Sequence, residues 1–242
     1  MAPPTQDTSA EWDAFADWYD QNMGDQGDPL NRQLLRPLVL EMLGELSGLT
    51  VLDCGCGSGY LTAELAGRAA RVIGTDASGA FVALCRRKYG AIANLEFLRH
   101  DLAAPLPFAA GAIDAALCKM VLQYTAEIEP FARESWRVLA GGGRLVVVVD
   151  HPFHAQFHFA QRLAGREPAK FPDLSHYFDP RPRHKISLWG RASLTWYPRT
   201  VSAYVHAFLE AGFRLRELRE LAEATAEAPV PRVLALRLEK PP

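Results

Sequence analysis

The sequence predicts an α/β protein built on a doubly wound, mostly parallel sheet of seven strands. From Leu49 onward, short apolar segments alternate with segments of helical periodicity, the pattern of a parallel sheet covered on both faces. The run 144-RLVVVVD-150 is apolar and β-branched, as expected of a strand that is buried on both faces. A turn with three glycines, 55-GCGSG-59, directly follows the first strand. We therefore expect a single domain whose ligand site lies at the carboxyl edge of the sheet.

The first 48 residues predict two helices ahead of the sheet. The segments 9-SAEWDAFADWYDQ-21 and 30-LNRQLLRPLVLEMLGEL-46 have helical periodicity. Pro37 either kinks the second helix or ends its first part, because proline lacks a backbone N–H. One apolar stripe of the second helix consists of Leu30, Leu34, Leu38, Met42 and Leu46. We expect residues 1–48 to form an N-terminal helical lid.

Residues 49–150 predict the ligand-binding core, and residues 201–242 complete the sheet. In the core, strands are expected at 50–54, 71–76, 95–99, 112–119 and 144–150, helices at 59–68, 78–89 and 126–139, and a loop at 140–143. After the core, helix 201–211 ends at Gly212 in the manner of a C-terminal glycine cap. Two strands, 213–219 and 232–239, then follow with only a loop between them, which indicates an antiparallel hairpin at the edge of the sheet.

Residues 151–200 interrupt this rhythm. They hold five of the seven histidines and nine of the 24 aromatic residues, with little periodicity. A structureless loop of this length is unusual inside a domain, so we expect an insertion with structure of its own beside the carboxyl edge. The same segment has eight Lys and Arg against three Asp and Glu, which indicates either an anionic acceptor or a solvated loop.

Composition limits the classes of function. The formal net charge of −2 argues against a nucleic-acid partner held by bulk electrostatics. The four cysteines, Cys54, Cys56, Cys85 and Cys118, form neither a disulfide framework nor a pair of zinc-spaced motifs. The N-terminus resembles no targeting peptide, and no apolar run approaches the ~20 residues that span a bilayer. We expect a cytoplasmic protein without a membrane or nucleic-acid partner, either a monomer or a homodimer.

The glycine turn is followed by a pattern of acids that restricts its ligand. Its spacing is G-x-G-x-G, and Tyr60 stands where a dinucleotide-binding turn would have its third glycine. No Lys-Ser or Lys-Thr follows, so the turn is not a P-loop. Asp53, Asp76 and Asp101 each come at or just after the end of one of three successive strands. Three carboxylates at one sheet edge suit a nucleoside with a positive charge better than a diphosphate.

In these residues the chain resembles the class I S-adenosylmethionine-dependent methyltransferases, within their small-molecule branch (methyltransferase domain 11/25-like). The matching segments are 51-VLDCGCGSGYLT-62, 73-IGTDAS-78, 100-HDLAAPLPF-108, 113-IDAALCKMVLQY-124 and 136-WRVLAGGGRLVVVVDHPF-153. The resemblance covers about residues 10–240 and implies a Rossmann-like fold, with 49–150 as the S-adenosylmethionine-binding core and 151–200 as an acceptor-pocket insertion.

The resemblance also implies a set of cofactor-binding residues. Asp76 would accept the ribose hydroxyls, and Asp101 with Leu102 would hold the adenine. Gly55 and Gly57 would bring the turn close to the methionine moiety, to which Cys118 and Lys119 would offer backbone groups. Tyr19 either lies over the cofactor or is an ordinary core aromatic. The full set is Tyr19, Asp53, Gly55, Cys56, Gly57, Asp76, Ala77, His100, Asp101, Leu102, Cys118 and Lys119.

Catalytic candidates come from the region after the fifth strand. His151 follows that strand directly, and its ordinary pKa near 6.5 suits a general base; a structural role at the strand end is the alternative. His154 and His158 follow at helical spacing, but without a nearby carboxylate we expect no metal. Relatives often carry Tyr-His-Arg where this chain has 197-YPR-199, so Tyr197 and Arg199 either line the acceptor pocket or only pack.

The predicted function is therefore methyl transfer from S-adenosylmethionine to a small molecule, with secondary metabolism as the suggested setting. A second hypothesis keeps the cofactor but changes the chemistry, for example to an intramolecular cyclisation. A third is a cofactor-binding regulatory or scaffold protein, against which the aromatic insertion argues. An NAD-dependent dehydrogenase fits poorly because of Asp53 and Tyr60.

Overall fold

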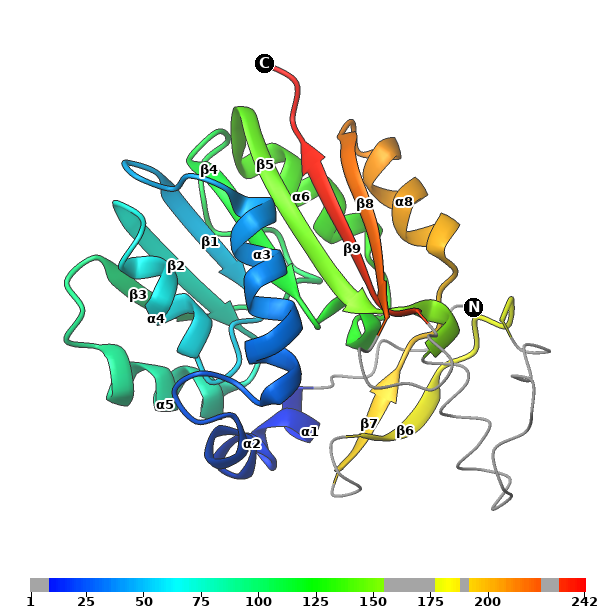
Figure 1. Ribbon diagram of the computed structural model, residues 1–242, viewed down its shortest axis with the longest axis horizontal. Helices are drawn as coiled ribbons and strands as arrows, with labels where there is room; N and C mark the ends of the chain where they lie inside the picture. Colours follow the sequence, from blue (N-terminus) through cyan, green and yellow to red (C-terminus); the bar gives the residue numbers. More distant parts are fainter. Residues whose placement is uncertain (1–8, 155–176, 188–191, 223–230) are drawn as a thin grey trace.

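A seven-stranded sheet forms the centre of the protein (Figure 1). The computed structural model describes residues 9–154, 177–187, 192–222 and 231–242. The strands are β1 (Thr50–Cys54), β2 (Arg71–Asp76), β3 (Leu95–Arg99), β4 (Ile113–Lys119), β5 (Leu139–Asp150), β8 (Arg214–Ala222) and β9 (Pro231–Glu239). Their order across the sheet is β3-β2-β1-β4-β5-β9-β8.

The pairing of the strands confirms the predicted fold class. Strand β1 pairs in parallel with β2 on one side and with β4 on the other. Strand β9 pairs antiparallel with both β5 and β8, so the C-terminal hairpin closes one edge as predicted. The chain winds outward in both directions from β1 and β4, and their carboxyl ends define the switch point at which such sheets bind ligands.

Helices cover both faces of the sheet (Figure 1). One face packs against α3 (Arg36–Leu43), α4 (Tyr60–Ala66) and α5 (Gly79–Tyr89), and the other against α6 (Glu129–Val138) and α8 (Val201–Glu210). Alternate residues of the strands serve the two cores: Val51 and Val146 belong to the first, and Leu52 and Val147 to the second. All four side chains are fully buried, as expected for a parallel sheet between two layers of helices.

The N-terminal helices differ from the prediction in their continuity. The single helix expected over 9–21 is two short helices, α1 (Ser9–Asp13) and α2 (Ala16–Met23). The Phe15 N–H donates to the Trp12 carbonyl, a three-residue turn that breaks the α-helical repeat. The break lets Trp12 and Phe15 both pack into an aromatic cluster instead of following one helical stripe.

The helix expected over 30–46 begins with a π-helical turn, η1 (Asn31–Leu35), and continues as α3 up to Gly44. Pro37 lies in the first turn of α3, and just before it the Arg36 N–H donates to the Asn31 carbonyl, five residues back. The wider turn absorbs the missing proline donor without ending the helix. Of the predicted stripe, Leu38, Met42 and Leu46 are buried, whereas Leu30 and Leu34 are only half-buried. The buried face is wider than predicted, because Leu35, Val39 and Leu43 are buried as well.

Part of the expected insertion 151–200 is described. Strands β6 (Arg183–Ser187) and β7 (Ala192–Trp196) form a separate two-stranded antiparallel sheet. Figure 1 shows this hairpin beyond the carboxyl end of β5. His158 and the rest of 155–176 lie outside the described residues, so the role of the insertion as an acceptor pocket stays a prediction.

The glycine segment 140–143 is assigned to β5 rather than to a separate loop. The register with β4 nevertheless shifts there, from the pair Ile113–Leu139 to the pair Ala115–Arg144. Gly142 has φ of +75°, so this part of the strand bulges where the sequence predicted a loop.

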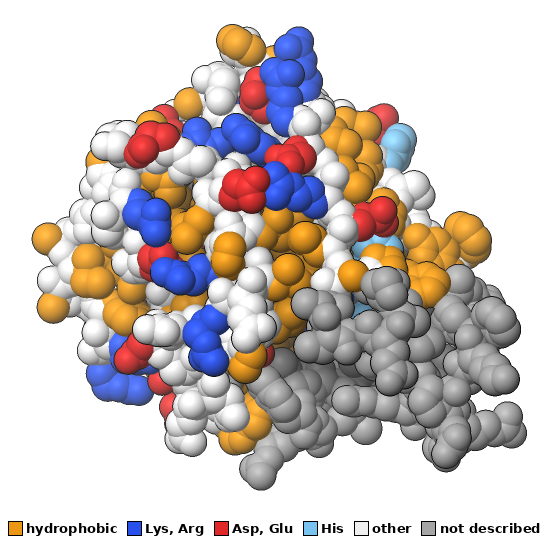
Figure 2. All heavy atoms as spheres, in the orientation of Figure 1, with side chains coloured by type: hydrophobic (Ala, Val, Ile, Leu, Met, Phe, Trp, Pro, Cys, Tyr) orange, Lys and Arg blue, Asp and Glu red, His pale blue; other side chains and the backbone are white. Residues whose placement is uncertain are grey.

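The surface in Figure 2 carries acidic and basic side chains side by side over its described part. Ion pairs such as Arg219–Glu41 and Arg216–Glu239 reflect this mixing. Among the helices that the structure describes, none has the length and apolarity needed to cross a membrane.

Candidate active site

A pocket of about 950 Å³, part of it open to solvent, lies at the carboxyl edge over β1, β2 and β4. Eleven of the twelve predicted cofactor residues line it. The exception is Cys118, whose side chain is fully buried in the core between the sheet and α6. The prediction for Cys118 concerned its backbone, which the lining does not test.

The glycine turn adopts a conformation that other residues rarely take. Gly55, Gly57 and Gly59 have φ values of +75°, +53° and +76°. A Cβ on Gly55 would overlap the Val121 side chain, and one on Gly59 would lie 2.7 Å from Cys85 Sγ. A Cβ on Gly57 would meet only Tyr19, at 3.9 Å, so this glycine faces open pocket. Two glycines therefore serve internal packing, and the third leaves room for a ligand.

The N–H groups of the turn are largely used within the protein. Those of Gly55 and Cys56 donate to the Thr75 carbonyl at 2.7 and 2.9 Å. The N–H of Gly57 donates to Asp76 Oδ2 at 2.9 Å, and that of Gly59 donates to the Cys56 carbonyl. A diphosphate cradle requires such donors to point at the ligand. The turn therefore approaches its ligand closely without offering a phosphate site.

Asp53, the second-last residue of β1, lines the pocket. Its side chain is 3% exposed, and Oδ2 accepts a hydrogen bond from Thr62 Oγ1 at 2.7 Å. Burial raises the pKa of Asp53 to about 6, although the Thr62 hydrogen bond and Lys119 oppose the shift. A cationic ligand above this carboxylate would favour its ionised form.

Asp76 ends β2 and joins the turn to the start of α5. Besides the Gly57 N–H, it accepts the Ser78 N–H through Oδ1 at 2.9 Å. Burial raises the pKa of this carboxyl group, whereas the two backbone donors lower it. Each oxygen retains a second lone pair, which is what two neighbouring ribose hydroxyls require.

The pocket continues past β3 to His100, Asp101 and Leu102. Leu102 is 6% exposed, and Asp101 Oδ1 accepts the Ala103 N–H at 2.9 Å. Burial lowers the pKa of His100, which keeps the imidazole neutral near pH 7. The sequence predicted this pair, an apolar side chain beside a carboxylate, as the place of the adenine, and that role stays a prediction.

Aromatic side chains form the wall opposite the turn, and the sequence prediction missed most of them. Trp12 lies 5.2 Å from Tyr124 and 6.2 Å from Phe81 between ring centroids, and Tyr19 lies 5.5 Å from Phe81. All four line the pocket. They come from α1, from α2, from α5 and from the short helix η2 (Leu122–Tyr124). No local pattern connects these segments, since only tertiary packing brings them together.

Two side-chain contacts fix α1 over the pocket. Asp13 Oδ1 accepts from Ser78 Oγ at 2.5 Å and from the Ala80 N–H at 3.0 Å. Glu11 accepts from the N–H and the hydroxyl of Thr195 on β7, at 2.8 and 2.7 Å. Trp12 lies between these two acids, so α1 ties the insertion hairpin to the edge of the cofactor pocket.

Lys119, at the carboxyl end of β4, lines the pocket beside Tyr60 and Asn31. Its neighbour Met120 has φ of +61°, the one positive value among the described non-glycine residues. The Met120 N–H donates to the Val148 carbonyl at 2.7 Å. This strained turn directs the chain from β4 along the pocket floor.

The predicted catalytic residues lie outside this pocket. His151 is 4% exposed; its Nδ1 accepts the Phe153 N–H at 3.1 Å, and its Nε2 lies 2.7 Å from Glu220 Oε1. Because Nδ1 accepts, Nε2 carries the proton and donates to Glu220. Both ring nitrogens are therefore occupied, an arrangement that favours the structural alternative for His151.

His154, just after β5, and Tyr197, just after β7, are also buried. His154 Nε2 lies 3.0 Å from an Arg232 guanidinium nitrogen, and the Tyr197 N–H donates to the Gln123 carbonyl at 2.8 Å. Within the described ranges, no three His, Cys, Asp or Glu side chains converge as a metal site. Catalytic roles for His151, His154 and Tyr197 remain predictions.

Arg199 holds the backbone beside the pocket. Its guanidinium donates to the carbonyls of Leu122, Thr125 and Ala126, and it lies 5.9 Å from the Tyr204 ring centroid. These contacts favour the packing role for Arg199 over a place in the acceptor pocket. His206 is exposed on α8.

The fold and the pocket define a doubly wound protein with a nucleoside-type site at the carboxyl edge. A family model described as a methyltransferase domain matches residues 52–147. The trans-aconitate 2-methyltransferase of Azoarcus sp. is 31% identical over 189 residues, which cover 71% of each chain. The demethylmenaquinone methyltransferase of Lactococcus lactis is 35% identical over 125 residues, and the chain spans only about half of its length, 49%.

Solved structures share the fold. An S-adenosylmethionine-dependent methyltransferase from Mesorhizobium loti superposes with a TM-score of 0.71 at 24% identity, covering 84% of this chain and 96% of that one. The [4+2]-cyclase SpnF superposes with a TM-score of 0.62 at 20% identity, covering 87% and 81%. The chain belongs to the S-adenosylmethionine-dependent methyltransferases. The predictions of family, fold and cofactor class are thus confirmed.

Proposed function

We propose that this protein transfers the methyl group of S-adenosylmethionine to a small-molecule acceptor. The observation that carries the proposal is the pocket at residues 53–60. The turn leaves open space for a ligand at Gly57, but its N–H groups donate hydrogen bonds within the protein. Three carboxylates at strand ends line the same pocket. That combination suits a cationic nucleoside and lacks the donors that a diphosphate needs.

Different lining residues would contact different parts of the donor. Asp76 would accept the ribose hydroxyls, and His100, Asp101 and Leu102 would surround the adenine. Gly55, Cys56, Gly57 and Asp53 would lie beneath the sulfonium and the methionyl group. Tyr19 borders the open space at Gly57, which supports its predicted position over the cofactor.

Methyl transfer is an in-line displacement that places few demands on side-chain chemistry. Holding the acceptor and the methyl carbon in line can supply about 7–11 kcal/mol of the barrier. A general base is needed only when the acceptor must lose a proton in the reaction. Since both nitrogens of His151 are engaged, we propose an acceptor that arrives deprotonated or reacts through a polarised carbon.

The aromatic wall supports a flat, largely apolar acceptor. Trp12 and Tyr124 both line the pocket, and their rings pack edge to face with centroids 5.2 Å apart. Flat rings pack well against such edge-to-face aromatic pairs. A relative named for demethylmenaquinone acts on a molecule of this shape, which agrees with the proposal.

A cyclisation is the second candidate, because the fold is shared with the [4+2]-cyclase SpnF. Calorimetry with S-adenosylmethionine, S-adenosylhomocysteine and NAD tests the cofactor. Binding of NAD alone would overturn the proposal. Mass spectrometry of the products then separates the chemistries, since only methyl transfer adds the mass of one methylene group.

For location and partners, we propose the cytoplasm and neither nucleic acid nor membrane. All four cysteines are free thiols, as in proteins of a reducing compartment. The mixed charges of the surface in Figure 2 offer no extended basic track on that face. Light scattering of the purified protein would distinguish a monomer from a homodimer.

A further inference from the structure

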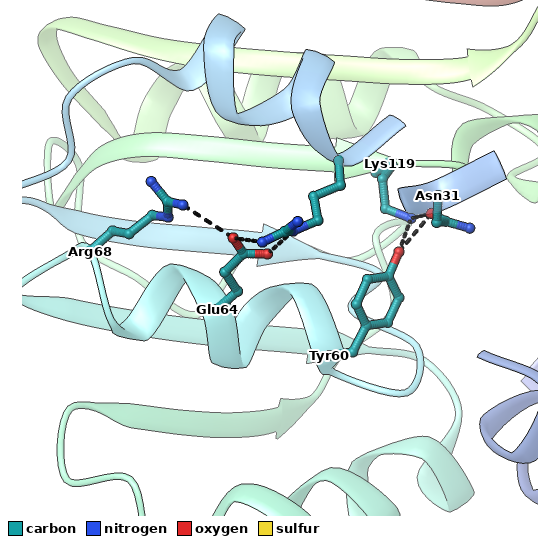
Figure 3. Close-up of polar contacts among 6 residues, drawn as sticks. Asn31, Tyr60, Glu64, Arg68 and Lys119 are labelled. Atoms are coloured by element: carbon teal, nitrogen blue, oxygen red, sulfur yellow. Dashed lines mark hydrogen bonds and ion pairs between the residues drawn. The ribbon is translucent and has the colours of Figure 1, made fainter. Parts of the chain in front are cut away.

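Gln123 is a buried polar side chain without a hydrogen-bond partner. It is 1% exposed, and neither Oε1 nor Nε2 has a partner among the described residues. Buried polar groups in proteins are normally paired, as the Tyr60 hydroxyl is with Asn31 Oδ1 at 2.6 Å (Figure 3). A buried amide that lacks its partners lowers stability, so its presence indicates a group that binds there.

Two other buried atoms without partners belong to the donor pocket. Ser58 Oγ and His100 Nε2 have no hydrogen-bond partner in the described part of the chain, and both residues line that pocket. The donor would meet them there. Gln123 is not one of the described lining residues, so the donor does not account for its amide.

Gln123 lies where the aromatic wall meets the insertion hairpin. Helix η2 is a 3-10 helix with three residues per turn, so Val121, just before it, and Tyr124 share a face, and both line the pocket. Leu122 belongs to the core on the α6 side of the sheet. Gln123 takes the third face. Helix η2 also contacts β7, and the Gln123 carbonyl accepts the Tyr197 N–H at 2.8 Å.

The backbone around Gln123 is fixed, whereas no hydrogen bond to a described residue holds its side chain. Arg199 donates to the carbonyls of Leu122 and Thr125, at 2.9 and 2.5 Å. The Cα atoms of neighbouring residues are about 3.8 Å apart, so an acceptor that packs on Tyr124 lies within reach of the Gln123 amide. Rotation of the side chain brings the two together without a movement of η2.

The amide limits the chemistry of its partner. It has N–H donors on Nε2 and an acceptor on Oε1. A carboxylate or a phosphate accepts from Nε2 but leaves Oε1 without a donor, and an ammonium group does the reverse. A carbonyl next to a hydroxyl pairs with both ends. Hydroxylated ring ketones carry such an edge, and they have the flat shape that the aromatic wall supports.

We propose that Gln123 determines acceptor specificity and binds a flat acceptor at an edge where a ring carbonyl lies next to a hydroxyl. The inference rests on the proposed function, because it concerns the molecule that receives the methyl group. The amide lowers the stability of the free protein, and the acceptor supplies the partners it lacks. An analogue without the polar edge leaves the amide unpaired, which is how a buried hydrogen-bonding site rejects it.

The first measurement is the thermal stability of the free protein. Gln123→Met removes the amide with little change in volume, so the unfolding midpoint should stay the same or rise. Gln33→Met is the matched control: Gln33 is exposed in η1, and its loss should not change the midpoint. A fall of more than about 2 °C in Gln123→Met alone would show that the amide has a structural partner, and would overturn the inference.

The second measurement is acceptor binding. Wild type and both variants, saturated with S-adenosylhomocysteine, are titrated calorimetrically with three bicyclic probes. The probe 3-hydroxychromone has a carbonyl next to a hydroxyl, chromone has the carbonyl alone, and 2H-chromene has neither. We expect wild type and Gln33→Met to bind 3-hydroxychromone at least about tenfold more tightly than 2H-chromene, with chromone between them. In Gln123→Met the difference should shrink to within about threefold, with 2H-chromene unaffected.

The outcomes separate the inference from the proposed function. Unchanged affinity of Gln123→Met for S-adenosylhomocysteine shows that the donor site of the variant is folded. A preference for 3-hydroxychromone that persists in Gln123→Met would overturn the inference. Equal affinity of the three probes for wild type, or no binding of any, would overturn it as well. Failure of wild type to bind S-adenosylhomocysteine would overturn the proposed function instead.

Discussion

The carboxyl edge of the sheet contains two polar regions that differ in how their groups are used. Over β1, β2 and β4, the carboxylates and Lys119 face a pocket and keep hydrogen-bonding capacity beyond their internal contacts. Over β5 and β9, the polar side chains pair with one another, as His151 does with Glu220 and His154 with Arg232. Spare capacity toward an open space distinguishes a binding site from a buried polar network, although both lie at strand ends.

The largest expected effect is a loss of stability from a substitution in the glycine turn of the first region. Gly55→Ala adds a Cβ that overlaps Val121 in a residue with φ of +75°, and we expect a loss of about 2–5 kcal/mol in the free energy of unfolding. Denaturant titration measures it. Gly57→Ala is the matched variant, since its Cβ meets only Tyr19 at 3.9 Å. It should lose about 1–2 kcal/mol from backbone strain but bind the donor poorly. Equal stability of Gly55→Ala and wild type would contradict the packing argument.

The second prediction removes the carboxylate that joins turn and ribose site. Asp76→Ala should weaken S-adenosylhomocysteine at least about tenfold, because hydrogen bonds to a charged group contribute about 1.5–3 kcal/mol. It also frees the N–H groups of Gly57 and Ser78. Asp114→Ala is the control: Asp114 accepts the Thr50 N–H at the opposite edge of the sheet and should leave the affinity unchanged. Similar losses in both variants would mean that Asp76 acts only through stability.

The third prediction concerns pH. Burial raises the pKa of Asp53 to about 6, so the carboxyl group is ionised at pH 7 and mostly neutral at pH 5. A cationic donor prefers the ionised form, and its affinity should fall about tenfold from pH 7 to pH 5. Stability from this group has the opposite sign: it is present below the ordinary pKa and is lost as pH rises through about 6. Asp53→Asn should flatten the calorimetric pH profile, and an unchanged slope would assign the effect to other groups.

Local sequence predicted the first region well. Strands β1, β2 and β3 have the predicted bounds, because apolar β-branched runs between turns determine them. The glycine turn and Asp76 lie within 25 residues of each other along the chain, so their proximity follows from one strand-helix-strand unit. What the sequence could not give was Trp12, Phe81 and Tyr124, which meet only through the packing of α1 on α5 and η2. The π-helical turn that brings Asn31 to Tyr60 could not be predicted either, since Pro37 was the one sign of an irregularity in that helix.

The second region shows what local sequence cannot decide. A histidine at a strand end predicts a base only if its nitrogens remain available, and that depends on residues far along the chain. Glu220 lies 69 residues from His151, and Arg232 lies 78 residues from His154. Strands β8 and β9 bring both partners to the end of β5. The aromatic and histidine content of 151–200 therefore marked the segment as unusual but could not separate catalysis from packing.

The smallest expected effect comes from a substitution in the second region, at the partner of His151. Glu220 is half exposed, so its ion pair with His151 should contribute little, and Glu220→Gln keeps an acceptor for the Nε2 proton. We expect a change of less than about 1 kcal/mol in stability, with donor affinity and turnover unchanged. His151→Ala, which also removes the acceptor of the Phe153 N–H, should destabilise more, by about 1–3 kcal/mol. Thermal unfolding and turnover per folded molecule measure both variants. If Glu220→Gln instead lowered turnover by about 10²–10⁴ at constant stability, His151 would be a base oriented by Glu220, and the second region would belong to the active site.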